Sequence, residues 1–466
     1  MNATRLSRRT LLTSACAVAA ITIGATGRTR AKASIARKPN ILFIMADDLG
    51  YADLSCYGQT TYATPVLDRL ASGGLKLLQG YASSAVCSAT RTALVTGHYP
   101  QRYAIGLEEP VGPNDNLSLP AGTPTIASRL KKEGYRTALV GKWHVGAIPN
   151  HGPTRFGYDH FFGISAGSAD YFGHAGARGA KTNNRGGLFL GETPVTRNGY
   201  LTDLLADEAS RWIGEKSDVP FFLSLHFNAP HWPWEGPNDE SHSRTLQILR
   251  DPAGGSLETY AEMVRAMDSA IGRVLAHLTN LGMDQDTLIV FTSDNGGERY
   301  SNTWPFTGTK GELLEGGIRV PLIINWPDHI GANQTSGQVM TSMDFLPTLL
   351  AAAGAAPLSL KDSDGVNLLP QILGHSPVKA RTLFWRYKAN EQSAIRDGDW
   401  KYLKISGKEH LFHISKDPRE RANLAEAHPD IFDDLKKKYD IWNTGVLPYT
   451  AESSSEDVKS IYADRY

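Results

Sequence analysis

The sequence has little cysteine and no excess of charge of either sign. Among its 466 residues there are three cysteines, and the formal net charge is zero. So few cysteines exclude a disulfide-rich scaffold. The balanced charge, without a basic stripe between aromatic residues, argues against nucleic acid as a partner. The composition is that of an ordinary globular protein, 41% hydrophobic and 21% charged, and the length suggests one large domain plus a smaller one.

A long hydrophobic run is also missing. The N-terminal segment LLTSACAVAAITIGATG is too short and too polar to span a bilayer, so we expect no permanent membrane anchor. Arginines precede this segment and the small-residue motif AKA follows it, which is typical of a cleaved export signal. The pair Arg8-Arg9 favours the twin-arginine route, and Cys16 lies too close to it for a lipoprotein signal. We predict an export signal over residues 1–33 and a bacterial protein that is periplasmic or secreted.

Short apolar runs with helical segments between them predict a sheet covered by helices. The predicted strands cover residues 40–45, 136–141, 220–227, 287–292 and 320–326, and the predicted helices cover residues 125–133, 201–215, 257–280 and 344–353. Nearly continuous apolar strands that alternate with helices are typical of a parallel sheet with both faces covered. We predict an α/β fold with a mostly parallel central sheet between helices, in a catalytic domain over residues 34–375.

The C-terminal part of the chain has a different pattern. Short alternating strands occur in TLFWRY, SAIRDGDWKYLKI and HLFHI, and Asp397-Gly398 is a hairpin signal. A helix follows over about residues 429–442. We therefore expect residues 376–466 to form a small α+β subdomain, in which one helix packs on an antiparallel sheet.

Polar side chains follow four of the predicted strands. Ligands of open parallel sheets bind just past the carboxyl ends of the strands, so we expect these side chains to meet at one edge. Singly, each has a structural alternative as a helix cap, a turn residue or a hydrogen-bonded core histidine; together they favour one polar site. In chain order they are Asp47 and Asp48, Lys142 and His144, His231, and Asp294 and Asn295.

The oxygen-bearing members of this set indicate a hard divalent cation. Asp47, Asp48, Asp294 and Asn295 offer oxygen ligands, and no His or Cys pair has the spacing of a zinc site. Oxygen ligands favour calcium or magnesium over zinc or copper. We favour one calcium ion, because calcium tolerates irregular geometry from scattered loops better than magnesium does.

The stretch AVCSATRTALVTG places a lone thiol, Cys87, at the start of a predicted helix. Three interpretations are open: a packing residue, a nucleophilic cysteine, or the precursor of another group. The helix N-terminus and the cations Arg91, Lys142 and Lys310 suit a small anion. A soft thiolate is a poor match for a hard cation, and a cysteine protease would hold no calcium at its thiol. An oxygen nucleophile would suit these surroundings.

The sequence resembles the type I sulfatases of the alkaline phosphatase superfamily. Their signature is Cys-x-Pro-Ser-Arg-x-x-x-Leu-Thr-Gly, and residues 87–97 here read CSATRTALVTG. The resemblance extends over nearly all of the chain after the leader, in family order, through KPNILFIMADDLGYADLSCYG, GYRTALVGKWHVG, FGYDHFFG, PFFLSLHFNAPHWP, IVFTSDNGG, GTKGELLEGGIRVP and AIRDGDWKYL. It implies an alkaline phosphatase-like fold and a sulfuric ester hydrolase.

The resemblance also implies a nucleophile and a metal centre. Cys87 would be oxidised to formylglycine, whose geminal diol provides the oxygen that attacks sulfur. The calcium ligands would be Asp47, Asp48, Asp294, Asn295 and the modified Cys87, and Asp294 would also take the proton of the attacking hydroxyl.

The remaining roles that the resemblance implies concern charge and proton transfer. Arg91 and Lys142 would hold the formylglycine oxygen and neutralise developing charge. His144 would deprotonate the second hydroxyl and so release sulfate. His231 and Lys310 would bind the sulfate oxygens and protonate the leaving oxygen.

The chain departs from the family signature at two positions. Ala89 stands in place of proline and Thr90 in place of serine, while Cys87 and Arg91 are kept. The departure therefore concerns maturation more than mechanism. A sulfatase-maturation enzyme that acts on Cys87 is an expected partner. The other is the twin-arginine export machinery, which carries folded proteins, so we expect modification in the cytoplasm before folding buries residue 87.

The expected substrate is an extracellular sulfated carbohydrate, with aryl sulfates as surrogates. Trp232, Trp234 and Trp304 would stack on a sugar or fill loops, and His174, Arg178 and Arg386 would contact polar groups of the substrate or face water. One alternative is a formylglycine-dependent phosphonate monoester or phosphodiester hydrolase, in which a histidine commonly stands where this chain has Asn295. The other is a non-catalytic homologue that binds sulfated glycans, against which the complete set of expected catalytic side chains argues.

Overall fold

The computed structural model describes residues 37–112, 117–175 and 187–458. The chain divides into two compact units, residues 1–36 and 37–466, and all of the described residues belong to the second. The predicted export signal and Arg178 lie outside the described residues, so both remain predictions.

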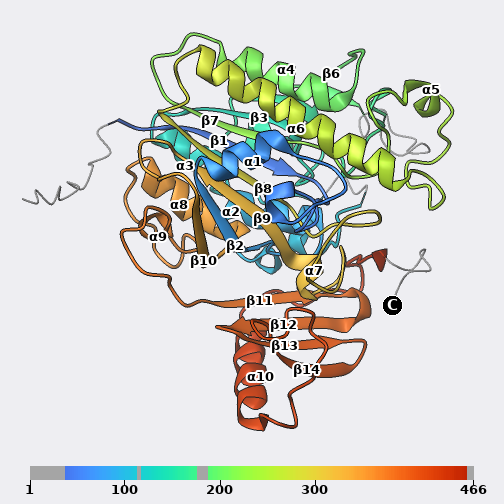
Figure 1. The fold of residues 1–466 in the computed structure, drawn as a ribbon, viewed down its shortest axis with the longest axis vertical. Coiled ribbons are helices and arrows are strands. Elements are labelled where there is room, and N and C mark those ends of the chain that lie inside the picture. Colours follow the sequence, from blue (N-terminus) through green and yellow to red (C-terminus); the bar gives the residue numbers. More distant parts are fainter. Residues whose placement is uncertain (1–36, 113–116, 176–186, 459–466) are drawn as a thin grey trace, which may run out of the picture. The chain divides into compact units, whose positions relative to one another are not determined.

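A large mixed sheet forms the centre of residues 37–466 (Figure 1). In spatial order its strands are β10 (Gln334–Thr341), β2 (Leu75–Tyr81), β9 (Arg319–Asn325), β8 (Thr287–Ser293), β1 (Asn40–Ala46), β7 (Phe221–His226), β3 (Arg136–Lys142), β4 (His160–Ile164), β5 (Leu188–Leu190) and β6 (Thr193–Val195). The five strands predicted from apolar runs are all present. Because β8, β1, β7, β3 and β4 pair in parallel, the prediction of a mostly parallel sheet is confirmed.

One of the predicted strands runs against the others. The segment predicted over residues 320–326 became β9, which pairs antiparallel with both β8 and β2. The connection from β8 to β9, residues 294–318, contains only the one-turn helix α7 (Glu315–Ile318) and no helix that crosses the sheet. The chain therefore starts β9 at the edge where β8 ended, as an antiparallel connection allows. This return keeps Lys310 at the same sheet edge as Asp294.

Helices cover both faces of the large sheet (Figure 1). α4 (Leu201–Ile213) and α6 (Leu257–Asn280) pack together on one face, and α4 contacts β3 and β7. α2 (Cys87–Thr96), α3 (Ile126–Lys132) and α8 (Phe345–Ala352) pack together on the other. In β1, Leu42 and Ile44 join the same core as Met263 of α6, whereas Phe43 points the other way and meets Phe345 of α8 with ring centroids 4.8 Å apart. This alternation is the period of two expected of a strand buried on both faces. The other helices are α1 (Pro65–Ser72), α5 (Glu240–Ser243), α9 (Leu369–Ile372) and α10 (Pro429–Thr444).

A separate antiparallel sheet of four strands lies in the C-terminal part, as predicted (Figure 1). Its strands follow one another in chain order: β11 (Thr382–Tyr387), β12 (Gln392–Asp397), β13 (Trp400–Ile405) and β14 (Lys408–His413). The predicted hairpin turn connects β12 to β13, and Gly398 adopts a φ of 61° there. α10 packs on β12 and β13. The domain boundary at residue 376 remains a prediction.

The two sheets share a buried junction. Trp385 of β11 donates its indole N–H to the Ala82 carbonyl, which follows β2, at 2.8 Å. Lys401 of β13 is fully buried and bridges two carboxylates, with Nζ 3.0 Å from Glu315 Oε1 and 2.8 Å from Glu420 Oε1. Buried ions are tolerated only when they are paired, so this network fixes the C-terminal sheet against the loop that carries Lys310.

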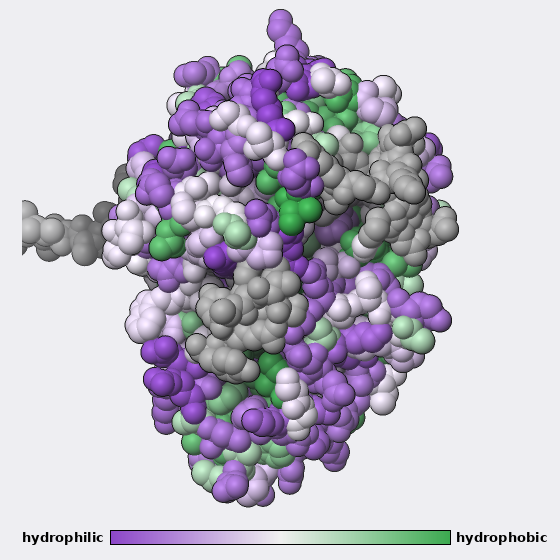
Figure 2. Space-filling view, turned by 90° about the vertical axis from the view of Figure 1, so that its right-hand side faces the viewer, coloured by the Kyte–Doolittle hydropathy of each residue, from purple (hydrophilic) through white to green (hydrophobic). Residues whose placement is uncertain are grey.

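On the face drawn in Figure 2, hydrophilic residues predominate and hydrophobic residues occur in small separate groups. Among the described residues, no helix has both the length and the apolar character needed to cross a membrane.

The described residues also form short 3₁₀ helices: η1 (Ser55–Tyr57), η2 (Pro100–Arg102), η3 (Ala104–Leu107), η4 (Pro153–Phe156), η5 (Ser342–Asp344) and η6 (Ala389–Glu391).

Candidate active site

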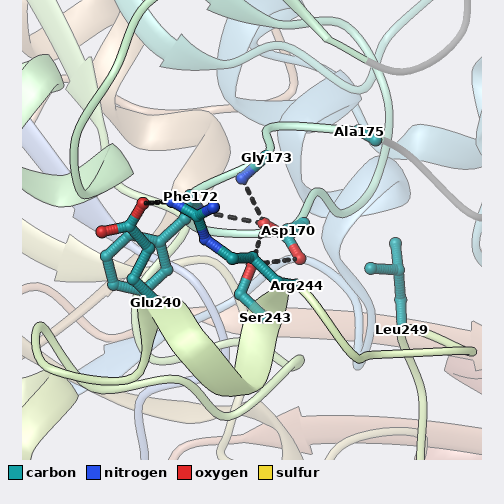
Figure 3. A pocket seen from close by; sticks show the side chains of 8 residues that line it. All are labelled: Asp170, Phe172, Gly173, Ala175, Glu240, Ser243, Arg244 and Leu249. Atoms are coloured by element: carbon teal, nitrogen blue, oxygen red, sulfur yellow. Dashed lines mark hydrogen bonds and ion pairs between the residues drawn. The ribbon is translucent and has the colours of Figure 1, made fainter.

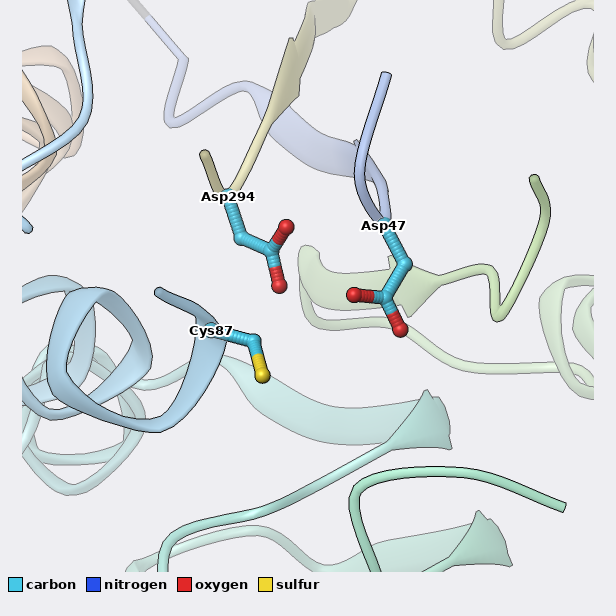
Figure 4. A group of neighbouring side chains, drawn as sticks. All are labelled: Asp47, Cys87 and Asp294. Atoms are coloured by element: carbon cyan, nitrogen blue, oxygen red, sulfur yellow. The ribbon is translucent and has the colours of Figure 1, made fainter. Parts of the chain in front are cut away.

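Three structural elements bring carboxylates and a thiol to one point at the carboxyl edge of the large sheet. Asp47 follows β1, Asp294 follows β8, and Cys87 is the first residue of α2. Figure 4 shows the three side chains pointing toward one another from these elements. One ligand atom from each lies within 4.8 Å of the others, and all three residues are buried. The structure thus brings these three residues together, two from the ends of strands and one from the start of a helix.

Each carboxylate of the site is paired with a cation. Arg91, one turn into α2, donates from Nε to Asp294 Oδ2 at 3.0 Å. Lys142, at the end of β3, donates from Nζ to Asp47 Oδ2 at 2.5 Å. The third pair is Lys310 Nζ with Asp48 Oδ2, at 2.6 Å. These pairs make the buried charges tolerable and hold the cations beside Cys87.

Asp48 is a second centre of contacts. Its backbone adopts a φ of 63°, an uncommon conformation for a residue other than glycine and one that is often found at functional sites. Asn295 Nδ2 donates to Asp48 Oδ1 at 2.7 Å, and His231 Nε2 lies 3.6 Å from Asp48 Oδ2. Asp48 therefore links Asn295, His231 and Lys310 to the rest of the site.

His144 is held so that only one of its ring nitrogens faces the thiol. Nε2 lies 3.1 Å from the Val111 carbonyl oxygen, to which it must donate, because a carbonyl only accepts. Nδ1 lies 3.3 Å from Cys87 Sγ, so in the neutral ring Nδ1 is the proton acceptor. His144 has a φ of 55°, and Gly167 lies against its ring: a Cβ added there would lie 2.5 Å from His144 Cε1.

Burial and neighbouring charges shift the pKa values of the carboxylates in different directions. Burial, together with the nearby Asp294 carboxylate, raises the pKa of Asp47 well above its usual range, although Lys142 opposes this. Burial also raises the pKa of Asp48. For Asp294 burial acts in the same sense, but Arg91 and Lys142 outweigh it and the pKa is lowered. Asp294 is thus the carboxylate most strongly held as an anion.

The histidines, Lys310 and the thiol respond to the same surroundings. Burial and the cation Lys142 lower the pKa of His144 well below its ordinary value, and burial with Lys310 does the same for His231. For Lys310, burial acts to lower the pKa, but Asp48 and Glu298 raise it well above its ordinary value. Burial raises the pKa of the Cys87 thiol despite the nearby lysines. An unmodified Cys87 is therefore held as a neutral thiol, which is a weak nucleophile.

The donor atoms fit a hard divalent cation. Asp47 Oδ1 and Asn295 Oδ1 are buried and have no hydrogen-bond partner among the described residues, although buried polar atoms are nearly always paired. Asp48 adds a further carboxylate within ligand distance of Asp47 and His231. Oxygen atoms from three carboxylates and one amide are the ligands that calcium or magnesium prefers.

The two departures from the family signature lie on buried positions of α2. Ala89 packs in a core cluster with residues of the C-terminal sheet. Thr90 Oγ1 donates to the Ser84 carbonyl at 3.0 Å and accepts from the Ser84 N–H at 3.1 Å. Thr90 keeps the hydroxyl of the usual serine, and that hydroxyl closes the turn before Cys87.

The predicted substrate residues occupy different surroundings. Trp232 is half-buried beside His231, with ring centroids 4.4 Å apart, and Trp234 is buried against Tyr300. Trp304 is 60% exposed. His174 is buried, and Arg386 donates to Leu447 and Asn443 within the C-terminal part of the chain.

A pocket of about 250 Å³ borders the loop that carries His174 (Figure 3). Its lining residues are Asp170, Phe172, Gly173, Ala175, Glu240, Ser243, Arg244 and Leu249. None of these residues belongs to the cluster around Cys87. Tyr171, between two of them, donates its hydroxyl to the His231 carbonyl at 2.9 Å, so one wall of the pocket is linked to the cluster.

Three residues of the site were not predicted from the sequence. His226, at the end of β7, packs under Arg91, with Nδ1 3.2 Å from the Lys142 carbonyl. Glu298 lies between Lys310 and Arg250, at 3.4 and 3.3 Å. Val111 contributes only its backbone carbonyl. A histidine at the end of a mostly apolar strand was an available signal for His226. The contact of Val111 left none, because a backbone carbonyl is common to every residue type.

Comparison with known proteins agrees with this arrangement. The family model described as Sulfatase matches residues 39–355, and the model described as N-sulphoglucosamine sulphohydrolase, C-terminal, matches residues 309–442. Arylsulfatase A of Homo sapiens is 31% identical over 461 residues, which cover 87% of each protein. N-acetylgalactosamine-6-sulfatase of Mus musculus is 32% identical over 453 residues, covering 85% of this chain and 84% of that protein.

Solved structures agree with the fold. The structure of Ps i-CgsB in complex with k-i-k-neocarrahexaose has a TM-score of 0.79 and 29% sequence identity, and the match covers 91% of this chain and 96% of that one. The family model spans more than half of this chain, and both curated relatives exceed 30% identity over most of its length. The chain therefore belongs to the sulfatase family of the alkaline phosphatase-like superfamily, and it is a sulfatase.

Proposed function

We propose that this sulfatase removes sulfate from an extracellular sulfated carbohydrate, using a formylglycine made from Cys87 and one calcium ion. The net reaction consumes water and yields inorganic sulfate and the free sugar hydroxyl. The observation that carries the proposal is the position of Cys87, whose sulfur lies among buried carboxylates and within 3.3 Å of a histidine nitrogen. A soft thiol is a poor ligand for a hard cation, whereas an oxygen made at that position would be a good one.

The metal proposal rests on the donor set. Asp47, Asp48, Asp294 and Asn295 would hold the cation, and the unpartnered oxygens of Asp47 and Asn295 support this assignment. Bound there, calcium would supply positive charge that activates an oxygen nucleophile and offsets the charge of the sulfate group. Formylglycine would supply that nucleophile as a hydroxyl of its geminal diol.

The protein's own groups account for orientation and charge. Arg91 and Lys142 are held by Asp294 and Asp47, and we propose that they keep the oxygen at position 87 oriented and neutralise charge that develops on it. Such preorganised cations act strongly because both are buried, where the effective dielectric constant is low. Asp294 would accept the proton of the attacking hydroxyl.

Two proton transfers would complete the reaction. His144 presents Nδ1 toward residue 87, which supports its role as the base that releases sulfate. His231 and Lys310 both lie close to Oδ2 of Asp48. We assign them to binding the sulfate oxygens and protonating the leaving oxygen. A sugar alkoxide needs that proton more than a phenolate does.

A carbohydrate substrate is favoured by similarity. The name of N-acetylgalactosamine-6-sulfatase refers to a sulfated sugar. The structure of Ps i-CgsB was solved with an oligosaccharide, k-i-k-neocarrahexaose. Trp232, half-buried beside His231, would offer a ring face to a sugar. We also propose that residues 1–33 direct twin-arginine export of the folded enzyme, and that a sulfatase-maturation enzyme modifies Cys87 first. The catalytic domain would be residues 34–375 and the smaller subdomain residues 376–466.

A panel of purified substrates tests the proposal. Enzyme produced with a sulfatase-maturation enzyme is assayed for sulfate release from sulfated oligosaccharides and 4-nitrophenyl sulfate, and for cleavage of phenyl phosphonate monoesters and phosphodiesters. We expect the highest kcat/KM on a sulfated oligosaccharide. A higher kcat/KM on the phosphonate would contradict the proposal, and tight binding of sulfated oligosaccharides without turnover would indicate a non-catalytic homologue.

A further inference from the structure

The last described residues of the chain return to the active site. Residues 447–458 follow α10, and we call them the C-terminal strap. They contact the segment 108–111, the side chain of Arg250 and Gly311, which follows Lys310. The strap therefore reaches the loops on two sides of the cluster around Cys87.

The first contact of the strap is with Glu109, a fully buried carboxylate. Tyr449 donates its hydroxyl to Glu109 Oε1 at 2.5 Å, and Ser455 donates its hydroxyl to Oε2 at 2.8 Å. The backbone is paired as well: Glu109 N–H donates to the Ser454 carbonyl at 3.0 Å, and Glu456 N–H donates to the Glu109 carbonyl at 2.8 Å. Two side-chain and two backbone hydrogen bonds thus fix Glu109 to the strap.

Glu109 is two residues from the carbonyl that orients His144. The Val111 carbonyl accepts from His144 Nε2 at 3.1 Å, and the Val111 N–H donates to Ser88 Oγ at 2.8 Å. Ser88 is the residue after Cys87. The segment that the strap holds is therefore the one that sets which nitrogen of His144 carries the proton and that ties this histidine to the start of α2.

The second contact of the strap reaches Lys310. Arg250 is ion-paired with Glu456 and donates from Nη2 to the Val458 carbonyl at 2.9 Å. The same guanidinium lies 3.3 Å from Glu298, whose other oxygen is 3.4 Å from Lys310 Nζ. Removal of the strap would change the partners of Arg250 and, through Glu298, the surroundings of Lys310.

We propose that the C-terminal strap is a positioning element of the active site. By holding residues 108–111 it keeps the Val111 carbonyl on His144, so that Nε2 carries the proton and Nδ1 faces residue 87 as the acceptor. The strap makes no chemical contribution of its own; Tyr449 and Ser455 are positioning residues that act through Glu109. The inference rests on the catalytic role proposed above for His144.

The double variant Tyr449→Phe/Ser455→Ala removes both hydroxyl donors to the Glu109 carboxylate and leaves the aromatic ring in place. The backbone N–H of Lys388, which donates to Glu109 Oε2 at 2.7 Å, is retained. The matched control is Tyr402→Phe, which also loses a tyrosine hydroxyl donated to a glutamate, at 2.9 Å from Glu409, but on the small sheet and away from residues 108–111. Each is made in the wild-type and in the His144→Ala background. The single variant Ser455→Ala is included in case the double variant folds poorly, and unfolding midpoints are measured for all.

For the double variant in the wild-type background we expect kcat on 4-nitrophenyl sulfate to fall by about 10- to 100-fold, as small displacements of catalytic groups can produce. KM should change little and the Tyr402→Phe control should match wild type. In the His144→Ala background the double substitution should have no further effect. An unchanged kcat, or an equal fall in both backgrounds, would overturn the proposal.

A second readout does not depend on turnover. In protein labelled with ¹⁵N in its imidazole rings, the His144 signals are identified by their loss in His144→Ala. We expect the Nε2–H tautomer in the wild type and a mixture of tautomers in the strap variant. Identical His144 signals in the two proteins would contradict the strap's role. An inactive wild type with the expected tautomer would contradict the proposed function alone.

Discussion

Gly167 gives the sharpest test of how His144 is held. A Cβ at this position would lie 2.5 Å from His144 Cε1 and 2.8 Å from Nε2, well inside ordinary van der Waals contact. The backbone angles of Gly167 lie outside the left-handed region, so alanine is not strained there, and the clash with the ring is the main consequence. In Gly167→Ala the imidazole must therefore move by roughly 1 Å, a misplacement that can cost about 100-fold in rate.

We expect kcat for 4-nitrophenyl sulfate to fall by about that factor, with little change in KM, because His144 is assigned to sulfate release and not to substrate binding. Gly331→Ala is the matched control, since its added Cβ would meet only Gln334 at 3.7 Å. In a His144→Ala background the Gly167 substitution should lose its effect. Wild-type kcat in Gly167→Ala, or the same fall in the absence of the His144 ring, would show that Gly167 does not act by positioning His144.

Three further predictions concern stability and metal content. Lys401→Met leaves the buried carboxylates of Glu315 and Glu420 without their shared cation, so the free energy of unfolding in urea should fall by about 3–5 kcal/mol; a fall below about 1 kcal/mol would contradict this. Burial raises the pKa of Glu109 from 4.5 to about 7, so the native state binds this proton more tightly than the unfolded chain does. The contribution of this group to the free energy of unfolding is complete at low pH. About 3 kcal/mol of it should be lost between pH 4.5 and 7 in wild type but not in Glu109→Gln. Parallel profiles of unfolding free energy against pH for the two proteins would contradict this prediction. Removal of divalent cations by a chelator should abolish sulfate release and lower the unfolding midpoint, with calcium restoring both better than magnesium; unchanged activity after metal analysis shows the cation removed would rule out the metal's proposed role.

The strands and helices around the site could be predicted because their apolar runs are strong. The run at residues 40–45 is buried on both faces of the sheet and reads as a strand without ambiguity. By contrast, β2 contains Lys76, Gln79 and Gly80, and β10 is polar over its first half, so neither stood out as a strand. The direction of β9 also escaped prediction, because an apolar run carries no information about whether its neighbours are parallel.

The residues of the site likewise divide into those that could be predicted from the sequence and those that could not. Residues that directly follow strands, such as Asp47 and Asp294, could be grouped because the topology of a parallel sheet brings strand ends together. The orientation of His144 could not be predicted, because it depends on the backbone carbonyl of Val111. That carbonyl is held in turn through Glu109 and Ser455, which lie 346 positions apart in the chain. Such contacts arise from tertiary packing and leave no periodic pattern or motif.

We propose that Cys87 is converted to an aldehyde, and that the aldehyde supplies the nucleophile. Mass spectrometry of the peptide that ends at Arg91 tests it directly, on protein produced with a sulfatase-maturation enzyme that accepts alanine at position 89. We expect a peptide in which the thiol has been replaced by an aldehyde, in a fraction that rises in proportion to kcat across preparations. A fully active enzyme whose peptide retains the intact thiol would contradict it.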